Sequence, residues 1–251
     1  MLLKTDNDNI GYFTKNNPEA ELAIQNILNE NKQNMSIFAH ELRNPLSLIK
    51  GTLQYIETKH TEVKDYKYWD QIPELIKDME RMISDALALN KLNTLDKTNT
   101  NFVNLINSIY NGYAQLALSH GKDLKLTIEP ECETYLSSYQ CDPARLKQAI
   151  CNLIQNAFEA TVSGDYIHIH LAIVPEEGLS PRNFAMMISN NGLPIHDSEL
   201  QNIFTPFVTY KKGGTGVGLA VTKKIVELHY GTITVSSNPS ATTFTIVLPL
   251  E

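Results

Sequence analysis

A histidine, a carboxylate and an amide lie close together in one helical segment of the sequence. His40 is followed directly by Glu41, and Asn44 comes about one helical turn later. Through the same segment apolar residues recur every seven positions, which is the pattern of a helix packed in a bundle. They are Met35, Leu42, Ile49 and Ile56 at one position of the repeat and Phe38 at the other. The repeat places His40 on the face turned away from this seam, where an imidazole could attack a second substrate; a solvated surface histidine is the alternative.

Two asparagines form a second group of residues suited to chemistry. Asn152 and Asn156 lie four residues apart within a helical pattern over 145–160, so they share one helix face. Neutral amide oxygens can ligate Mg²⁺, which otherwise keeps its water and binds substrate phosphates. The pair is compatible with two solvated surface amides or with part of a magnesium site.

A glycine-rich turn opens a helix predicted over 217–228. The turn reads Gly214-Thr215-Gly216-Val217-Gly218-Leu219. Glycines let backbone N–H groups approach phosphate at a helix N-terminus. The turn lacks the Gly-Lys-Ser/Thr ending of a P-loop, and it lacks the GxGxxG spacing after a strand that is typical of dinucleotide-binding folds. The turn therefore matches neither of these two phosphate-binding motifs.

The composition excludes several classes of protein. The net charge is −7, which argues against a general binder of nucleic acid or membrane surface. No apolar run approaches the roughly 18–20 residues that span a bilayer, so no membrane insertion is expected. The three cysteines, Cys132, Cys141 and Cys151, are odd in number and widely spaced. They indicate reduced thiols and a cytoplasmic location.

The pattern along the chain predicts two domains after a polar, flexible segment over residues 1–17. Residues 18–93 contain two seamed helices that form an antiparallel hairpin, and a homodimeric four-helix bundle would cover their apolar stripes. A polar stretch over 93–101 marks the boundary. Residues 101–251 mix helices and strands, which indicates a two-layer α/β sandwich. The elements expected there are helices over 102–118, 145–160 and 217–228 and strands over 124–128, 166–171, 184–189, 232–236 and 243–248.

Taken in order, these motifs resemble those of the sensor histidine kinases of two-component systems. Residues 40–46, His-Glu-Leu-Arg-Asn-Pro-Leu, resemble the H box, and residues 152–157 the N box. Residues 190–195 occupy the G1 box, 203–207 match the F box and 214–219 the G2 box. The resemblance covers about residues 20–250. It implies a dimerisation and phosphotransfer hairpin followed by a Bergerat-type ATP-binding domain.

The resemblance also implies a mechanism for the hairpin. His40 would attack the γ-phosphate of ATP, with Glu41 as the proton acceptor that orients the ring. The phosphoryl group would then pass to an aspartate of a separate response regulator. Asn44 matches the residue that positions water when such kinases dephosphorylate their partner.

For the second domain the resemblance implies a site for ATP and Mg²⁺. Asn156 would bind the metal ion, Asn152 would support it, and Lys211 or Lys212 would reach the triphosphate. Asn190 stands where the family has an aspartate that accepts a hydrogen bond from the adenine amino group. The expected nucleotide-binding residues are Asn152, Asn156, Asn190, Gly192, Lys211, Lys212, Gly214, Thr215, Gly216, Val217, Gly218, Leu219 and Thr243.

Two other functions and one other metal site remain open at this point. The chain could be an ATP-binding regulator, such as an anti-sigma-factor kinase, or a phosphotransfer scaffold without catalysis. His168 and His170 share one face of a predicted strand and could bind a metal, although a solvated strand face is the simpler interpretation.

Overall fold

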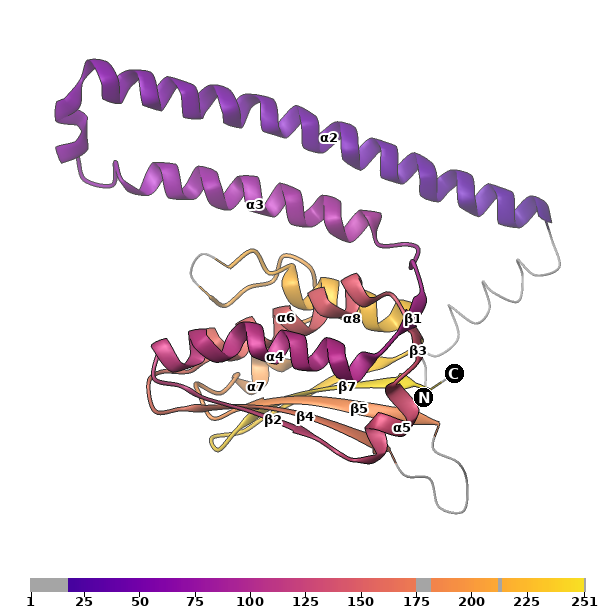
Figure 1. Ribbon diagram of the computed structural model, residues 1–251. Coiled ribbons are helices and arrows are strands. Elements are labelled where there is room, and N and C mark those ends of the chain that lie inside the picture. Colours follow the sequence, from indigo (N-terminus) through magenta and orange to yellow (C-terminus); the bar gives the residue numbers. More distant parts are fainter. Residues whose placement is uncertain (1–17, 175–181, 212–213, 251) are drawn as a thin grey trace. The chain divides into compact units, whose positions relative to one another are not determined.

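The computed structural model describes residues 18–174, 182–211 and 214–250 (Figure 1). The segment 1–17, expected to be flexible, lies outside the described residues. The chain divides into two compact units, residues 1–91 and 92–251, here called the helical unit and the α/β unit. Each unit is described by itself.

The helical unit is a hairpin of two long helices. Helix α2 (Pro18–Lys59) continues across Pro45, and helix α3 (Gln71–Lys91) returns antiparallel to it (Figure 1). A short 3₁₀ helix, η1 (Thr61–Asp65), forms part of the connection. The predicted hairpin is therefore present.

The stripe of α2 that packs on α3 differs from the seam predicted from the heptads. Ala39 and Leu46 are buried at 3% and 4% exposure, and with Leu53 they again repeat every seven residues. The α3 residues packed against them are Ile72, Ile76, Ile83 and Leu87. In the predicted seam, by contrast, Leu42 is 37% and Ile49 48% exposed. A bundle helix carries two adjacent apolar stripes, one for each neighbour, and within one chain α2 has a single neighbour.

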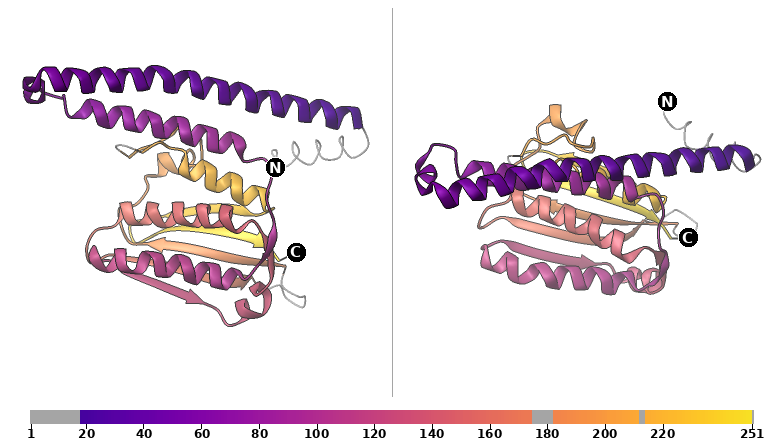
Figure 2. Two further views of the ribbon diagram at one scale, coloured as in Figure 1. Left: turned by 45° about the horizontal axis from the view of Figure 1, so that its top comes forward. Right: turned by 90° about the horizontal axis from the view of Figure 1, so that it is seen from above.

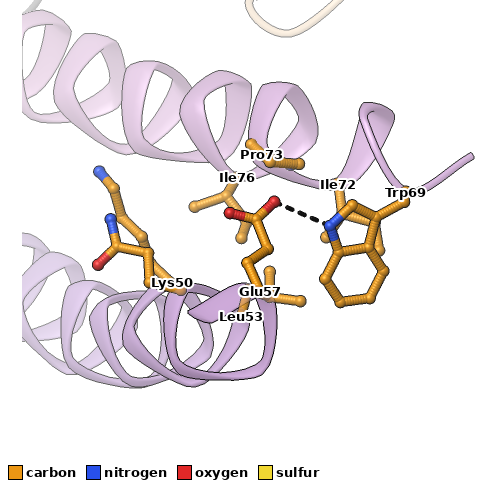
Figure 3. A pocket seen from close by; sticks show the side chains of 8 residues that line it. Lys50, Leu53, Glu57, Trp69, Ile72, Pro73 and Ile76 are labelled. Carbon is orange, nitrogen blue, oxygen red and sulfur yellow. Dashed lines mark hydrogen bonds between the residues drawn. The ribbon is translucent and has the colours of Figure 1, made fainter. Parts of the chain in front are cut away.

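The closed end of the hairpin holds a cavity of about 170 Å³ (Figure 3). Trp69 donates from Nε1 to the Glu57 carboxylate over 2.8 Å, which joins the connection to α2. Apolar side chains supply most of the remaining lining, namely Leu53, Ile72, Pro73 and Ile76, and Lys50 and Gln54 complete it. A side chain from outside this hairpin could fill the cavity.

The α/β unit is a five-stranded sheet with helices on one face (Figures 1 and 2). Its strand order is β2-β4-β5-β7-β6, with β2 and β4 parallel and the other pairs antiparallel. The strands are β2 (Asp123–Ile128), β4 (Tyr166–Val174), β5 (Asn183–Asn190), β6 (Thr232–Ser237) and β7 (Thr242–Pro249). The helices are α4 (Phe102–Ser119), α5 (Glu131–Leu136), α6 (Pro143–Ala160), α7 (Asp197–Leu200) and α8 (Gly218–Leu228). This is the predicted two-layer sandwich.

Apolar packing between α6 and the sheet forms the core of this unit. Alternate strand residues point toward the helices, because side chains alternate across a strand. Those on the inner face include Ile167, Ile169, Leu171, Phe184, Ile188 and Ile246, all exposed by 1% or less. Leu153 and Ile154 of α6 are 0% exposed against them. Each such side chain contributes about 1.5–3 kcal/mol through burial, and this fixes the rotation of α6 on the sheet.

The polar stretch expected as a linker belongs partly to the α/β unit. Strand β1 (Thr98–Thr100) pairs antiparallel with β3 (Tyr139–Cys141). Asn101 caps α4, since its side chain accepts a hydrogen bond from the Asn104 N–H over 2.8 Å. Polar residues therefore serve as cap and edge strand here, and the second unit begins at Leu92 rather than at residue 101.

A buried histidine connects the end of α8 to the start of α6. His229 is 2% exposed, and its Nε2 accepts a hydrogen bond from the Asp142 backbone N–H over 3.0 Å. Its Nδ1 donates to the Ile225 carbonyl over 2.8 Å. Burial lowers the pKa of His229, an effect that the hydrogen bond to Ile225 opposes and Lys97 reinforces. The neutral ring is therefore the form that the fold requires.

The lowered pKa of His229 predicts a stability that declines in mild acid. The unfolded chain holds this histidine at an ordinary pKa near 6.5, so below that pH it binds more protons than the folded chain. The free energy of unfolding should be highest above about pH 6.5 and fall as the pH drops toward the folded pKa. His229→Gln keeps an acceptor for Asp142 but does not titrate, and its decline should be shallower. Urea unfolding of both proteins across this range measures the slopes; equal slopes would contradict the assignment.

Candidate functional site

The helical unit presents His40, Glu41 and Asn44 to solvent. All three side chains are exposed, whereas Ala39 and Leu46 on either side are buried against α3. Burial of these two residues fixes the rotation of α2, and the histidine turns outward as a result. The structure thus places the three predicted residues on exposed surface of one helix segment.

Within the α/β unit, Asn152 connects helix α6 to the first turn of α8. Its Nδ2 donates to the Gly218 carbonyl over 3.1 Å and to the Thr222 hydroxyl over 3.4 Å. An added Cβ on Gly218 would lie 3.8 Å from this amide, which is ordinary contact. Asn152 therefore holds the glycine-rich turn beside α6, and these contacts give it a positioning role.

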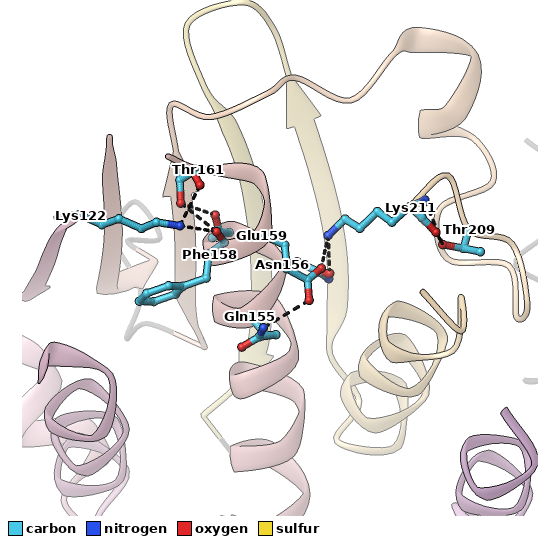
Figure 4. A network of polar contacts seen from close by, with 9 residues as sticks. Lys122, Gln155, Asn156, Phe158, Glu159, Thr161, Thr209 and Lys211 are labelled. Atoms are coloured by element: carbon cyan, nitrogen blue, oxygen red, sulfur yellow. Dashed lines mark hydrogen bonds and ion pairs between the residues drawn. The ribbon is translucent and has the colours of Figure 1, made fainter. Parts of the chain in front are cut away.

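Asn156 meets a lysine and a glutamate one turn further along α6 (Figure 4). The ammonium of Lys211 donates to Asn156 Oδ1 over 3.1 Å and to the Glu159 carboxylate over 2.7 Å. A cationic group thus contacts two side-chain oxygens of α6. Amide and carboxylate oxygens are also the ligands that Mg²⁺ prefers. Lys212, the alternative lysine, lies outside the described residues. Glu159 was not singled out from the sequence, although its spacing of three from Asn156 puts both on one face.

The glycine-rich turn is held by close packing against residues 207–209. Gly216 has φ +68°, and an added Cβ would lie 2.5 Å from the Val208 carbonyl oxygen. The Phe207 N–H donates to the Gly216 carbonyl over 3.0 Å. Helix α8 begins at Gly218, so Gly214, Thr215, Gly216 and Val217 precede it and Leu219 lies in its first turn. The predicted phosphate-binding turn therefore leads into a helix N-terminus.

The end of β5 comes close to the end of α6. Asn190 is the last residue of the strand, and its side chain is 2% exposed on the inner face. Gly192 packs so closely on the Ala160 carbonyl that no Cβ fits. The Leu193 N–H donates to the same carbonyl over 2.9 Å. Gly192 is therefore needed for packing, which brings Asn190 toward the helix that carries Asn156.

Two further carbonyls at this helix end also have a partner. The ammonium of Lys122, the residue before β2, donates to the Phe158 carbonyl over 2.6 Å and to the Thr161 carbonyl over 2.8 Å (Figure 4). A cation at a helix C-terminus complements its partial negative charge. These contacts make the end of α6 a fixed reference for the Asn190 turn.

The expected nucleotide contact of Thr243 needs correction. Thr243 lies on the outer face of the sheet, where its hydroxyl is 2.9 Å from that of Ser189. Asn190 faces Thr242 across the β5–β7 pair, and both are buried on the helix side. Because side chains alternate across a strand, a one-residue difference reverses the face. Thr242, not Thr243, shares the side of Asn190.

The two strand histidines show the features of a polar sheet face. The rings of His168 and His170 stack 5.9 Å apart on β4. His168 Nε2 lies 2.9 Å from the Thr127 hydroxyl, and His170 Nε2 lies 3.3 Å from the Glu129 carboxylate. In the described part of the chain, no group of three or more His, Cys, Asp or Glu residues could hold a metal ion.

Two family models match the chain, one in each unit. Residues 30–95 match the His Kinase A (phospho-acceptor) domain. Residues 141–251 match the histidine kinase-, DNA gyrase B-, and HSP90-like ATPase domain. The chain belongs to the sensor histidine kinase family. The family resemblance predicted from the motif order is confirmed.

Curated relatives of this chain come from several bacteria. Sporulation kinase D of Bacillus subtilis is 31% identical over 85% of this chain and 40% of its own length. Sensor histidine kinase ZraS of Escherichia coli K12 is 35% identical over 85% of this chain and 44% of its own length. This chain thus spans less than half the length of these two relatives.

Solved structures share the fold of this chain. The catalytic domain of histidine kinase ThkA is 28% identical, with a TM-score of 0.54 over 62% of this chain and 96% of that one. ThkA in complex with response regulator protein TrrA matches 99% of this chain and 68% of that one, with a TM-score of 0.62 and 23% identity. Among the described residues of this chain, no helix has the length and apolarity to cross a membrane.

Gly216→Ala tests the packing of the glycine-rich turn. The added methyl group meets a backbone carbonyl at a left-handed φ, so the free energy of unfolding should fall by about 1–3 kcal/mol. The matched control is Gly112→Ala in α4, where no heavy atom lies within 4 Å of the added Cβ. That change should instead stabilise by up to about 1 kcal/mol through helix propensity. Urea unfolding measures both; a Gly216→Ala protein as stable as the control would contradict the packing argument.

Proposed function

We propose that this chain is an ATP-dependent protein-histidine kinase. It transfers the γ-phosphoryl group of ATP to His40 and passes it to an aspartate of a response regulator. The observation that carries the proposal is the exposed His40 on a phospho-acceptor hairpin, in one chain with an ATPase domain. The ThkA complex with TrrA supports the choice of partner. Since ATP is the substrate, we place these two units in the cytoplasm.

The phosphoryl transfer uses the lone pair of a neutral imidazole nitrogen of His40. An N–P bond forms to the γ-phosphorus, the bridging P–O bond breaks, and ADP leaves with its electron pair. The proton on the other ring nitrogen passes to Glu41. Side chains at i and i+1 diverge on a helix, so this transfer requires rotamers that turn the two groups toward each other.

The phosphates of the nucleotide would lie by the Asn156 group and the start of α8. Asn156 Oδ1 would hold Mg²⁺ together with phosphate oxygens, and the ion would neutralise charge in the transition state. Lys211 reaches this group from the segment before α8, and its ammonium is a donor for phosphate. Gly216 and Gly218 would bring backbone N–H groups of the turn and the helix N-terminus to the same phosphates.

A second copy of the chain would cover the exposed stripe of the hairpin. Phe38 and Met79 are 56% and 50% exposed, and large apolar side chains continue this surface on both helices. They are Met35, Leu42 and Ile49 on α2 and Leu75 and Met82 on α3. Contiguous apolar surface of this kind marks an interface. Packing of two hairpins into a four-helix bundle would bury it and could fill the cavity beside Trp69.

Asn44 supports a second activity toward the partner. Its exposed amide lies about one turn from His40 on the same helix, within reach of a phosphoaspartate docked there. The amide can hold a water for attack on that phosphoryl group. The kinase would thus also dephosphorylate its response regulator.

Incubation with γ-labelled ATP, followed by acid and base treatment, tests the function against its alternatives. Phosphohistidine is lost in acid and kept in base. A regulator that acts as a Ser/Thr kinase would label a partner protein stably to acid, and a phosphotransfer scaffold would not label itself at all. Label on this chain that survives acid would overturn the proposal.

His40→Ala should abolish labelling and leave nucleotide affinity unchanged. The nucleophile lies in the helical unit, whereas the proposed nucleotide-binding residues all lie in the α/β unit. Labelling is followed with γ-labelled ATP, and ATP affinity by calorimetry. His60→Ala is the matched control, because His60 is also exposed in the helical unit but has no proposed role. Labelling that persists in His40→Ala would refute the assignment.

Asn156→Ala should lower the labelling rate by at least about a hundredfold, because Mg²⁺ loses a protein ligand. Gln155→Ala is the matched control, since Gln155 is the exposed neighbour and also contacts Glu159, over 3.3 Å. It should label at the normal rate. Raising the Mg²⁺ concentration should recover part of the Asn156→Ala activity. Equal rates for the two variants would remove Asn156 from the metal site.

A further inference from the structure

A buried amide at the end of β5 has a donor without an acceptor. The Asn190 side chain is 2% exposed, and its Nδ2 has no hydrogen-bond partner within the described residues. A buried polar group without a partner is costly, and such groups in native proteins call for an explanation. An acceptor supplied by a ligand would satisfy this donor.

The polar groups beside Asn190 are already engaged with one another. Asn191 Oδ1 accepts from the Tyr166 N–H over 2.7 Å. The Thr242 hydroxyl is 2.7 Å from that of Ser237. The Thr161 hydroxyl donates to the Ala157 carbonyl over 2.8 Å. These neighbouring polar atoms thus form hydrogen bonds with other groups. The Asn190 donor remains available to a bound ligand.

The position of Asn190 fits the base of a nucleotide. Its turn packs on Ala160, the last residue of α6. Asn156 lies four residues earlier on the same helix, about 6 Å along its axis, and holds the cationic Lys211 group proposed for the phosphates. The charged Lys211 therefore lies where the phosphates of the nucleotide are proposed to bind. The uncharged, buried amide of Asn190 lies further along α6, where the flat, weakly polar base would bind.

We infer that Asn190 reads the six-position of the purine and admits 6-oxopurine triphosphates as well as ATP. The inference rests on the nucleotide site proposed above. Adenine carries an amino donor at this position, whereas guanine and hypoxanthine carry a carbonyl acceptor next to an N–H donor. Nδ2 of Asn190 donates to that carbonyl, and Oδ1 accepts from the adjacent N–H. For adenine the amide turns over, so that Oδ1 accepts from the amino group.

A carboxylate at the same position would discriminate between the bases. It has acceptors only, so it binds the adenine amino group and repels the carbonyl of a 6-oxopurine. Exchanging a donor for an acceptor loses one hydrogen bond and leaves a buried carbonyl without a partner. The affinity for GTP relative to ATP should therefore fall by about tenfold or more in Asn190→Asp.

Calorimetric titration of the full chain with Mg²⁺ and ATP, GTP or ITP tests the inference. The wild-type protein should bind GTP and ITP within about tenfold of ATP. ITP should resemble GTP, because the two share the carbonyl and differ only in the 2-amino group. Asn190→Asp should lose GTP and ITP and keep ATP. Asn191→Asp is the matched control: it adds the same charge one residue away, its carboxylate can still accept from Tyr166, and the preference should not change.

The outcomes separate this inference from the proposed function. Wild-type protein that binds ATP but neither GTP nor ITP would overturn the inference and leave the kinase proposal standing. Wild-type protein that binds none of the three would overturn both. An Asn190→Asp protein that binds ATP with an unchanged preference would show that the amide does not face the base, as would an unchanged preference in Asn190→Leu.

Discussion

The Asp142 side chain holds together the segments from which the α/β unit is built. One carboxylate oxygen caps α6 by accepting from the Arg145 N–H, and the other accepts from the Asp96 N–H, both over 3.0 Å. The Asp142 backbone N–H donates to His229 at the end of α8. An N-cap alone contributes about 1 kcal/mol, and here it also fixes the segment before β1 and the far end of α8. The residues proposed for the nucleotide depend on this, because Asn152 and Asn156 lie on α6 and the glycine-rich turn leads into α8.

Helix α6 is the common reference for three parts of the proposed site. Its inner face is fixed by apolar packing on the sheet, and its polar face carries Asn152 and Asn156. Asn152 positions the start of α8, Asn156 receives Lys211, and the last carbonyl receives the turn after Asn190. The groups proposed to bind phosphate and to read the base thus come from distant parts of the chain and meet along one helix. Rotation of α6 would displace all of these groups together. The extensive apolar packing of α6 on the sheet prevents such a rotation.

Periodicity and motif order were sufficient to predict the hairpin, the sandwich and most of the proposed site residues. They could not predict which of two apolar stripes on α2 packs within the chain, because Ala39 and Leu46 repeat with the same spacing as Leu42 and Ile49. They could not show that Thr242, rather than the expected Thr243, lies on the side of Asn190, because β7 has apolar residues on both faces. Strand β1 is short and polar and has no alternation of apolar residues. It is a strand only because it pairs with β3, so the sequence pattern did not predict it. The Asp142–His229 contact joins residues far apart in sequence, and the burial of the Asn190 amide depends on packing between distant segments. No local sequence pattern encodes either feature.

The exposed apolar stripe of the hairpin has a consequence for its stability. Within one chain, the large side chains of this stripe, among them Phe38, Ile49 and Leu75, remain more than a third exposed, and the cavity beside Trp69 is unfilled. If a second copy supplies the missing contacts, part of the folding free energy of the hairpin comes from association. Its unfolding midpoint then rises with protein concentration, by mass action, while the α/β unit, whose core is complete in one chain, unfolds at a midpoint independent of concentration.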